Sequence, residues 1–351
     1  ETEWFSDDMG WLEGPPNSYT YDRAQNRIAA VRSYAGINES YGYSFANKMT
    51  NIWRGTQNAS SRYWYDLAGN LVTSIVKNVT NVYLYNALNK LAKVVTTNTV
   101  YEFRYNSRNE RIMVGTSVNG EALTWRYDVC QGPVTLAEYN HDCRMTRWYV
   151  RGVGVAEGIG DIVAEVDVSG ENLKPHYYLY NHRGDVLVVL NPDGAANSTF
   201  RYDAFGNYYQ MTGPFTPRYT FSTKEYLPAA GLYLYQYRVY DPIAGRWTQR
   251  DPIDYQDSIN LYQFCGNNPV TKVDRDGQLA GYIAIVAHAL WANYGPALAI
   301  RSDRIIPPGQ GSQCLAQVST TLMGVPLQKH WLPKSTKSVT CTTVTCESRA
   351  H

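Results

Sequence analysis

Aromatic and polar residues alternate in short runs along much of this chain, and an aromatic-x-Tyr triplet recurs within those runs. Two aromatic side chains at positions i and i+2 project from the same face of a β-strand. The triplets are Tyr19/Tyr21, Tyr41/Tyr43, Tyr63/Tyr65, Tyr83/Tyr85, Phe103/Tyr105, Trp125/Tyr127, Tyr178/Tyr180 and Phe200/Tyr202. The second residues of the first six triplets are 22, 22, 20, 20 and 22 residues apart. The pattern therefore predicts a repeat in which each unit offers one aromatic stripe to its neighbour.

Turn-forming residues follow these triplets at fixed positions. An Asp or Asn follows the second tyrosine at Asp22, Asp66, Asn86, Asn106, Asp128, Asn181 and Asp203. Such a side chain accepts a hydrogen bond from the backbone two residues on and opens a turn. Four residues after the tyrosine stand Asn47, Gly69, Asn89, Asn109, Gly184 and Gly206, the residue types that tolerate positive φ. A period near 22 then accommodates two short strands and two turns, which predicts a long antiparallel meander.

Composition agrees with β-structure and narrows the chemistry. The chain has 30 Tyr against 8 Phe and a formal net charge of +1, so nothing in its charge favours a nucleic-acid partner. The six cysteines include no C-x-x-C pair, and we expect no metal and no cofactor. Cys341 and Cys346 are close enough in sequence for a disulfide. Because the first residue is Glu, we interpret the chain as processed or as part of something longer.

Glycines are concentrated in the stretch Gly152 to Gly160, which superficially resembles a nucleotide-binding loop. The third glycine of a dinucleotide-binding motif is absent at its spacing, and a β-repeat context supplies no following helix. We interpret these residues as strand or turn glycines.

Two segments carry a resemblance to a known family. The unit Tyr65-Asp66-Leu67-Ala68-Gly69-Asn70-Leu71 resembles the tyrosine-aspartate (YD) repeat of Rhs proteins, insecticidal toxin-complex C subunits and teneurins. Residues 238 to 277, RVYDPIAGRWTQRDPIDYQDSINLYQFCGNNPVTKVDRDG, are similar to the Rhs-associated core segment. Their Tyr-Asp-Pro, Gly-Arg-aromatic, Asp-Pro, Asn-Leu-Tyr and Asn-Asn-Pro landmarks occur in the family's order. Together the two resemblances cover residues 19 to 278.

The resemblance implies an all-β fold, in which a spiralling antiparallel YD-repeat sheet forms a full or partial hollow shell. It divides the chain into a YD-repeat shell at 1–210, an Rhs-associated core segment at 211–278 that plugs the shell, and a variable extension at 279–351. We call residues 211–278 the plug segment. The expected extension is short and of mixed or helical structure.

The resemblance also implies an aspartate-type self-cleavage. Asp251 matches the aspartate of the family's Asp-Pro, Asp274 opens its terminal motif, and Arg238 matches the arginine before Tyr-Asp-Pro. Two carboxylates that share a proton supply both an acid and a base for hydrolysis, and an arginine polarises the carbonyl. The alternative is that all three residues make structural turn and ion-pair contacts.

The terminal motif departs from the family at two positions. It reads Asp274-Arg275-Asp276-Gly277-Gln278, with Arg in place of Pro and Gln in place of the Leu after which the cut normally falls. The expected scissile bond joins Gln278 and Leu279, and both changes lie beside it. They count against cleavage.

The character of the chain changes after Gln278. Residues 279 to 300 carry no charge, which favours a buried helix or plug, with a membrane span or a membrane-active effector as alternatives. Residues 301 to 351 hold six Lys or Arg against two acids, a local charge of +4 (6 − 2), but no nuclease motif.

These observations support three hypotheses. The first is a secreted bacterial Rhs/YD-repeat protein whose shell encloses or displays its own C-terminal extension, a toxin or effector. The second is an extracellular scaffold, adhesin or fibre subunit at the cell surface with no enzymatic activity. The third is an autoprotease that releases residues 279 to 351. The expected partners are the extension itself, other copies of the chain, a secretion or delivery apparatus, and surface carbohydrate.

Overall fold

A large antiparallel sheet dominates the computed structural model, which describes residues 2–3, 6–7, 10–11, 17–33, 36–55, 59–170, 173–256, 258–278 and 280–282. The sheet has 19 strands. From β4 to β21 each strand pairs antiparallel with the next one along the chain, and β1 (Thr2–Glu3) pairs with β4. The described residues form no α-helix. The prediction of an all-β fold is confirmed.

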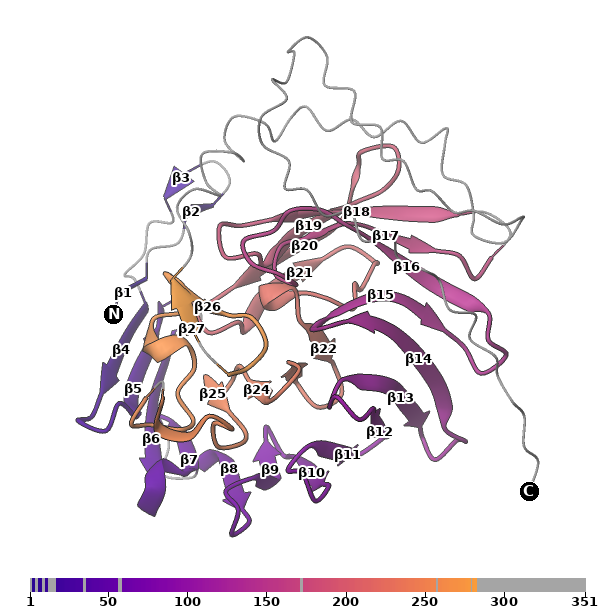
Figure 1. Ribbon diagram of the computed structural model, residues 1–351. Helices are drawn as coiled ribbons and strands as arrows, with labels where there is room; N and C mark the ends of the chain where they lie inside the picture. The colour runs from indigo at the N-terminus through magenta and orange to yellow at the C-terminus, as the bar shows by residue number, and fades with distance from the viewer. Residues whose placement is uncertain are drawn as a thin grey trace, which may run out of the picture. The chain divides into compact units, whose positions relative to one another are not determined.

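The strands of this meander are short and regularly spaced. They are β4 (Asn17–Tyr21), β5 (Arg27–Arg32), β6 (Ile37–Tyr43), β7 (Met49–Arg54), β8 (Ala59–Tyr65), β9 (Leu71–Val76), β10 (Val79–Tyr85), β11 (Leu91–Val95), β12 (Thr99–Tyr105), β13 (Arg111–Val118), β14 (Thr124–Gln131), β15 (Val134–Tyr139), β16 (Met145–Arg151), β17 (Ile162–Asp167), β18 (Lys174–Tyr180), β19 (Val186–Leu190), β20 (Ala196–Tyr202) and β21 (Tyr208–Thr212). A separate pair is formed by β2 (Ser6–Asp7) and β3 (Gly10–Trp11). Figure 1 shows the long ribbon curling into an incomplete shell.

The side chain after the second tyrosine accepts a turn N–H at Asp22, Asp66, Asn86, Asn106, Asn181 and Asp203. The Asn86 Oδ1 atom accepts hydrogen bonds from the Leu88 N–H at 2.9 Å and the Lys90 N–H at 3.0 Å. The residues predicted to take positive φ do so with values between 55° and 89°: Asn47, Gly69, Asn89, Asn109, Gly184 and Gly206. The turn chemistry predicted from the sequence is thus confirmed at these positions.

The two aromatics of a triplet have different roles. The first is buried on the concave side, at Tyr19, Tyr41, Tyr63, Tyr83, Phe103, Tyr178 and Phe200. In four triplets the second tyrosine donates its hydroxyl to the carbonyl oxygen of the first residue of the preceding strand. These bonds are Tyr43 to Arg27 (2.8 Å), Tyr85 to Leu71 (2.9 Å), Tyr105 to Leu91 (2.8 Å) and Tyr180 to Ile162 (2.9 Å). These hydroxyls add a side-chain bond to the backbone ladder between the two strands.

The triplet Trp125/Tyr127 departs from this arrangement, and the prediction that Asp128 opens a turn is wrong. Tyr127 is 37% exposed, whereas its neighbour Asp128 is buried. Asp128 also opens no turn, since β14 continues to Gln131. The register of β14 places Arg126 and Asp128 on the inner face, where Arg126 pairs with both Asp128 and Glu225. A buried charge cluster replaces the aromatic pair here.

The plug segment folds within the curve of the ribbon (Figure 1). Its strands β22 (Glu225–Leu227), β23 (Leu232–Leu234), β24 (Val239–Asp241) and β25 (Arg246–Trp247) form a small antiparallel sheet. Near its end, β26 (Lys272–Asp274) pairs with β27 (Ala280–Tyr282), which lies in the predicted extension. Plug aromatics such as Phe221, Tyr240 and Trp247 join the inner aromatic stripe in one hydrophobic core.

Side chains of the plug segment bind carbonyl oxygens of the hairpin turns along one rim of the ribbon. Tyr262 donates to Gly69 at 2.8 Å, Gln249 to Asn89 at 2.5 Å, and Tyr240 to Phe205 at 2.7 Å.

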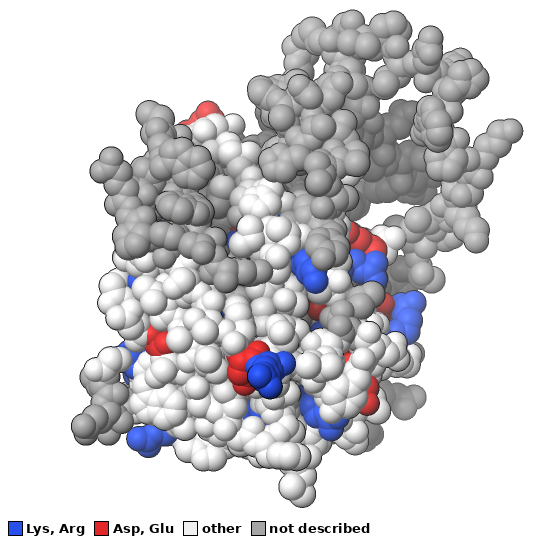
Figure 2. All heavy atoms as spheres, turned by 90° about the vertical axis from the view of Figure 1, so that its left-hand side faces the viewer, with Lys and Arg blue, Asp and Glu red and all other residues white. Residues whose placement is uncertain are grey.

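The exposed side chains of the molecule are mostly neutral on the side that Figure 2 draws. Charged side chains are scattered there among the neutral ones. Within the described ranges no helix is long and apolar enough to cross a membrane.

Candidate cleavage site

Arg238, Asp251 and Asp274 are far apart in sequence but meet inside the plug segment. Arg238 directly precedes β24 and is almost fully buried. Its Nη1 atom lies 2.8 Å from Asp251 Oδ2, and its Nη2 atom lies 3.4 Å from Asp274 Oδ2. The guanidinium also stacks on the Trp247 ring, 4.2 Å from the ring centroid. One buried arginine thus contacts both predicted catalytic carboxylates.

Asp274 ends β26 and organises the turn that follows it. Its Oδ1 atom accepts hydrogen bonds from the Gly277 N–H at 2.8 Å and the Gln278 N–H at 3.2 Å. Gly277 has φ of +91°, and a Cβ atom there would lie 3.1 Å from the Arg238 backbone nitrogen. Only glycine combines this conformation with so close an approach. We call residues 274–278 the cleavage turn.

The predicted scissile bond begins at a carbonyl that Arg238 contacts. The Arg238 Nη2 atom donates to the Gln278 carbonyl oxygen at 3.2 Å, and its Nε atom donates to the Gly277 carbonyl oxygen at 2.5 Å. Leu279, on the other side of the bond, lies outside the described residues. A guanidinium in this position stabilises negative charge that develops on the Gln278 carbonyl oxygen.

The buried setting changes the acidity of the carboxyl group at the turn. Burial raises the pKa of Asp274, and the adjacent Arg238 guanidinium opposes this rise only in part. A second carboxylate, Asp276, adds to the rise. The arrangement therefore brings together a carboxyl group with a raised pKa, a second carboxyl group and a fixed cation.

Contacts around the turn include residues that the sequence did not single out. Arg275 pairs with Glu157 at 3.2 Å, and Lys224 donates to the Gly158 carbonyl oxygen at 3.0 Å. Trp247 is the aromatic residue of the Gly-Arg-aromatic landmark, so the resemblance to the family could have singled it out as a site residue. Glu157 and Lys224 carried no such signal, because only the fold brings them to the turn.

Other predicted features fall outside this site. The Cys341–Cys346 disulfide and the basic tail lie outside the described residues. Of the uncharged run at 279–300, only residues 280–282 are described, and they form β27. Among the residues that are described, no group of three or more His, Cys, Asp or Glu side chains is placed to hold a metal ion.

Known proteins share parts of this sequence and its fold, although no family model matches the chain. The tRNA3(Ser)-specific nuclease WapA of Bacillus spizizenii is 30% identical over 185 residues, which is 51% of this chain and 7% of that protein. Toxin subunit YenC1 of Yersinia entomophaga is 44% identical over 64 residues, 18% of this chain and 6% of that protein. The chain thus spans only a small part of these curated relatives.

A solved structure shares the curved sheet. The crystal structure of TcdB2-TccC3-Cdc42 superimposes with a TM-score of 0.56 at 19% identity, covering 79% of this chain and 17% of the matched chain. The YD repeat, the Rhs-associated landmarks, the curved antiparallel sheet and these relatives agree with one another. The chain is similar to Rhs/YD-repeat proteins in its repeat, its landmarks and the fold of its sheet.

Proposed function

We propose that this chain is the shell part of a secreted Rhs-type toxin, and that it cuts itself between Gln278 and Leu279. The observation that carries the proposal is the position of Arg238, whose guanidinium contacts Asp251, Asp274 and the Gln278 carbonyl oxygen. The relatives are a tRNA nuclease and a toxin subunit by name, which supports the toxin assignment.

The proposed reaction is hydrolysis by two carboxyl groups, one acting as the base and the other as the acid. A water molecule attacks the carbonyl carbon of Gln278, and the Asp251 carboxylate accepts a proton from it. Arg238 stabilises the negative charge on the carbonyl oxygen of the tetrahedral intermediate. Asp274 is assigned the acid role because burial raises its pKa, and it gives its proton to the Leu279 nitrogen as the C–N bond breaks. The products are a carboxyl group on Gln278 and an amine on Leu279.

Intact mass measured under denaturing conditions tests this reaction. The expected wild-type products are one fragment that ends at Gln278 and one that begins at Leu279. Asp251→Asn and Asp274→Asn should each slow the cut by about 10²-fold or more, because each removes one proton-transfer group. Asp142→Asn, a change in an exposed turn, is the matched control and should cut normally. Persistence of the cut in Asp251→Asn would exclude the aspartate mechanism.

The extension at 279–351 is, in this proposal, the effector that the shell encloses or displays. The support is the switch from the repeat to an uncharged run followed by a basic tail. Expression of residues 279–351 inside host cells should inhibit growth, and the same chain fused behind the uncleaved shell should inhibit less. Normal growth with the extension expressed alone would remove the toxin assignment and leave the cleavage proposal standing.

A second candidate function is a structural one, as a subunit of a larger toxin assembly without enzymatic activity. The observation in its favour is that YenC1 is named a toxin subunit and that the matched chain of TcdB2-TccC3-Cdc42 is far longer than this one. Native mass measurement separates the two candidates. An uncut chain in particles well above 39.7 kDa would favour the structural function.

A further inference from the structure

The glycine-rich loop Gly152–Gly160 joins β16 to β17 and is a compact, rigid turn rather than a nucleotide-binding loop. The Val155 N–H donates to the Ile159 carbonyl oxygen at 2.9 Å, and the Gly158 N–H donates to Asp161 Oδ2 at 3.1 Å. A Cβ atom on Gly154 would collide with the Ile159 carbonyl oxygen. The glycines are therefore required by the tight path of the backbone.

The loop is anchored to both the plug segment and the ribbon wall. Lys224 Nζ donates to the Gly158 carbonyl oxygen at 3.0 Å, and the Gly160 N–H donates to Thr223 Oγ1 at 2.6 Å. The same Thr223 hydroxyl donates to the Gly184 carbonyl oxygen at 2.7 Å. A Cβ atom on Gly184 would lie 2.8 Å from the Gly160 nitrogen, so the loop packs directly on the neighbouring turn.

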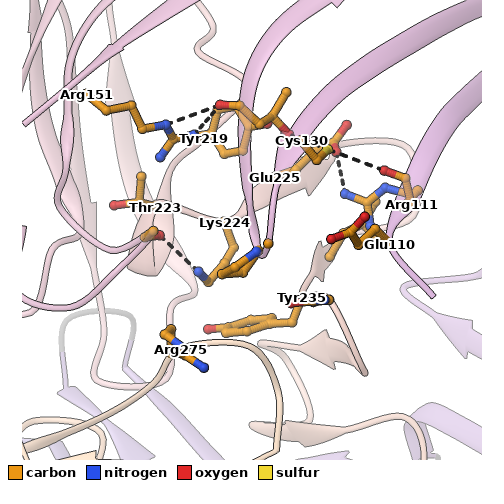
Figure 3. Close-up of a pocket in the computed structure, with 16 residues that line it drawn as sticks. Glu110, Arg111, Cys130, Arg151, Tyr219, Thr223, Lys224, Glu225, Tyr235 and Arg275 are labelled. Carbon is orange, nitrogen blue, oxygen red and sulfur yellow. Dashed lines mark hydrogen bonds and ion pairs between the residues drawn. The ribbon is translucent and has the colours of Figure 1, made fainter. Parts of the chain in front are cut away.

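The tip of the loop reaches the cleavage turn. The Glu157 Oε2 atom lies 3.2 Å from Arg275 Nη1, and Arg275 directly follows Asp274. Figure 3 shows Lys224 and Arg275 in the lining of the same pocket, beside the Tyr235 ring. Arg275 stands where the family motif has Pro, whose ring would fix the backbone φ of this turn. An ion pair to the loop is an alternative way to restrict the same turn.

We propose that Glu157 and Arg275 are positioning residues for the self-cleavage, and that the glycine-rich loop holds the cleavage turn only when wall and plug are assembled. The inference deepens the proposed cleavage and rests on it. The Glu157 side chain is 55% exposed and the Arg275 side chain 49%, so we expect the pair to contribute as much free energy as a typical exposed ion pair. Its loss should change the population of the correctly held turn by about two- to fivefold.

Hydrogen exchange in the full-length chain tests the positioning without relying on the cut. The chain carries Asp251→Asn, and its intact mass confirms that it is uncut. Adding Glu157→Gln should speed amide exchange of Gly277 and Gln278 by about two- to fivefold. Arg275→Lys, which keeps the cation, should leave exchange near the starting value. Glu102→Gln, which disrupts an ion pair on the outer face of β12, is the matched control and should have no effect.

The rate of the cut in the chain with Asp251 intact gives the second measurement. In a time course of in vitro translation, Glu157→Gln should slow the cut by the same factor and Arg275→Lys should not. Unchanged exchange and unchanged cutting in Glu157→Gln would overturn the positioning role, as would an equal effect of Glu102→Gln. If the chain with Asp251 intact never cuts, the proposed cleavage fails, and the exchange comparison still decides whether the loop holds the turn.

Discussion

At the scale of single residues, burial shifts the pKa of individual ionisable groups in this protein. Asp241, in the Tyr-Asp-Pro landmark, is buried and accepts hydrogen bonds from the Ile243 and Ala244 N–H groups at 2.8 and 3.0 Å. Burial raises its pKa to about 6, and these two backbone bonds only partly oppose the rise. The landmark aspartate is thus held in a turn where its charge is unfavourable.

We predict that Asp241→Asn stabilises the protein at pH 8. The folded state binds the Asp241 proton more tightly than the unfolded state, so the contribution of Asp241 to wild-type stability is greatest below about pH 4 and is lost as the pH rises through about 6. Asparagine keeps the accepting oxygen without the charge. Urea unfolding at pH 8 should show a gain of about 1–3 kcal/mol, and at pH 4 the gain should vanish. A gain of equal size at both pH values would contradict this explanation.

At the scale of the strand and turn, the second tyrosine of four triplets adds a side-chain bond between adjacent strands. Its hydroxyl bonds to a backbone carbonyl at the start of an earlier strand, as Tyr85 does with Leu71. The turns themselves need only local groups, since Asn86 closes its own turn through Lys90. Local turn chemistry therefore forms the hairpins, and the tyrosine hydroxyls reinforce the backbone ladder that joins one hairpin to the next.

Removing one such hydroxyl should weaken the ribbon measurably. Tyr85→Phe deletes the donor and leaves the Leu71 carbonyl oxygen without that bond, so the free energy of unfolding should fall by about 1 kcal/mol. Tyr127→Phe is the matched control, because that tyrosine occupies the same repeat position but lies on the outer face. Chemical denaturation should show a smaller loss for Tyr127→Phe. Equal losses would mean that the carbonyl contact does not matter.

At the scale of the whole molecule, a buried charge cluster joins the plug segment to the ribbon wall. Glu225 of β22 pairs with Arg111 at 2.8 Å, with Arg126 at 2.9 Å and with Arg218 at 3.5 Å. Burial acts to raise the Glu225 pKa, but the three arginines outweigh it and hold the pKa well below its usual value. The cluster explains why β14 presents Arg126 and Asp128 inward instead of its aromatic pair.

We predict that Glu225→Gln loosens the plug segment from the wall. It leaves buried arginines without their shared carboxylate, which should lower the free energy of unfolding by about 3 kcal/mol at pH 7. Because the folded pKa is lowered, this stabilisation is present above the unfolded pKa and is lost as the pH falls, so the difference between variant and wild type should shrink in strong acid. Thermal unfolding at pH 7 and pH 3 measures both effects. An undiminished difference at pH 3 would contradict the charge explanation.

The sequence alone determined the features that depend on near neighbours along the chain. The strand and turn periods follow from residues a few positions apart, as in the Asn86–Lys90 turn, and the Rhs-associated landmarks pointed to Arg238, Asp251 and Asp274. Only the tertiary structure decided which face of β14 is buried, because that choice depends on Glu225, 99 residues from Arg126. Only it brought Glu157 to Arg275, 118 residues away, since no local pattern encodes an approach that the curl of the whole sheet creates.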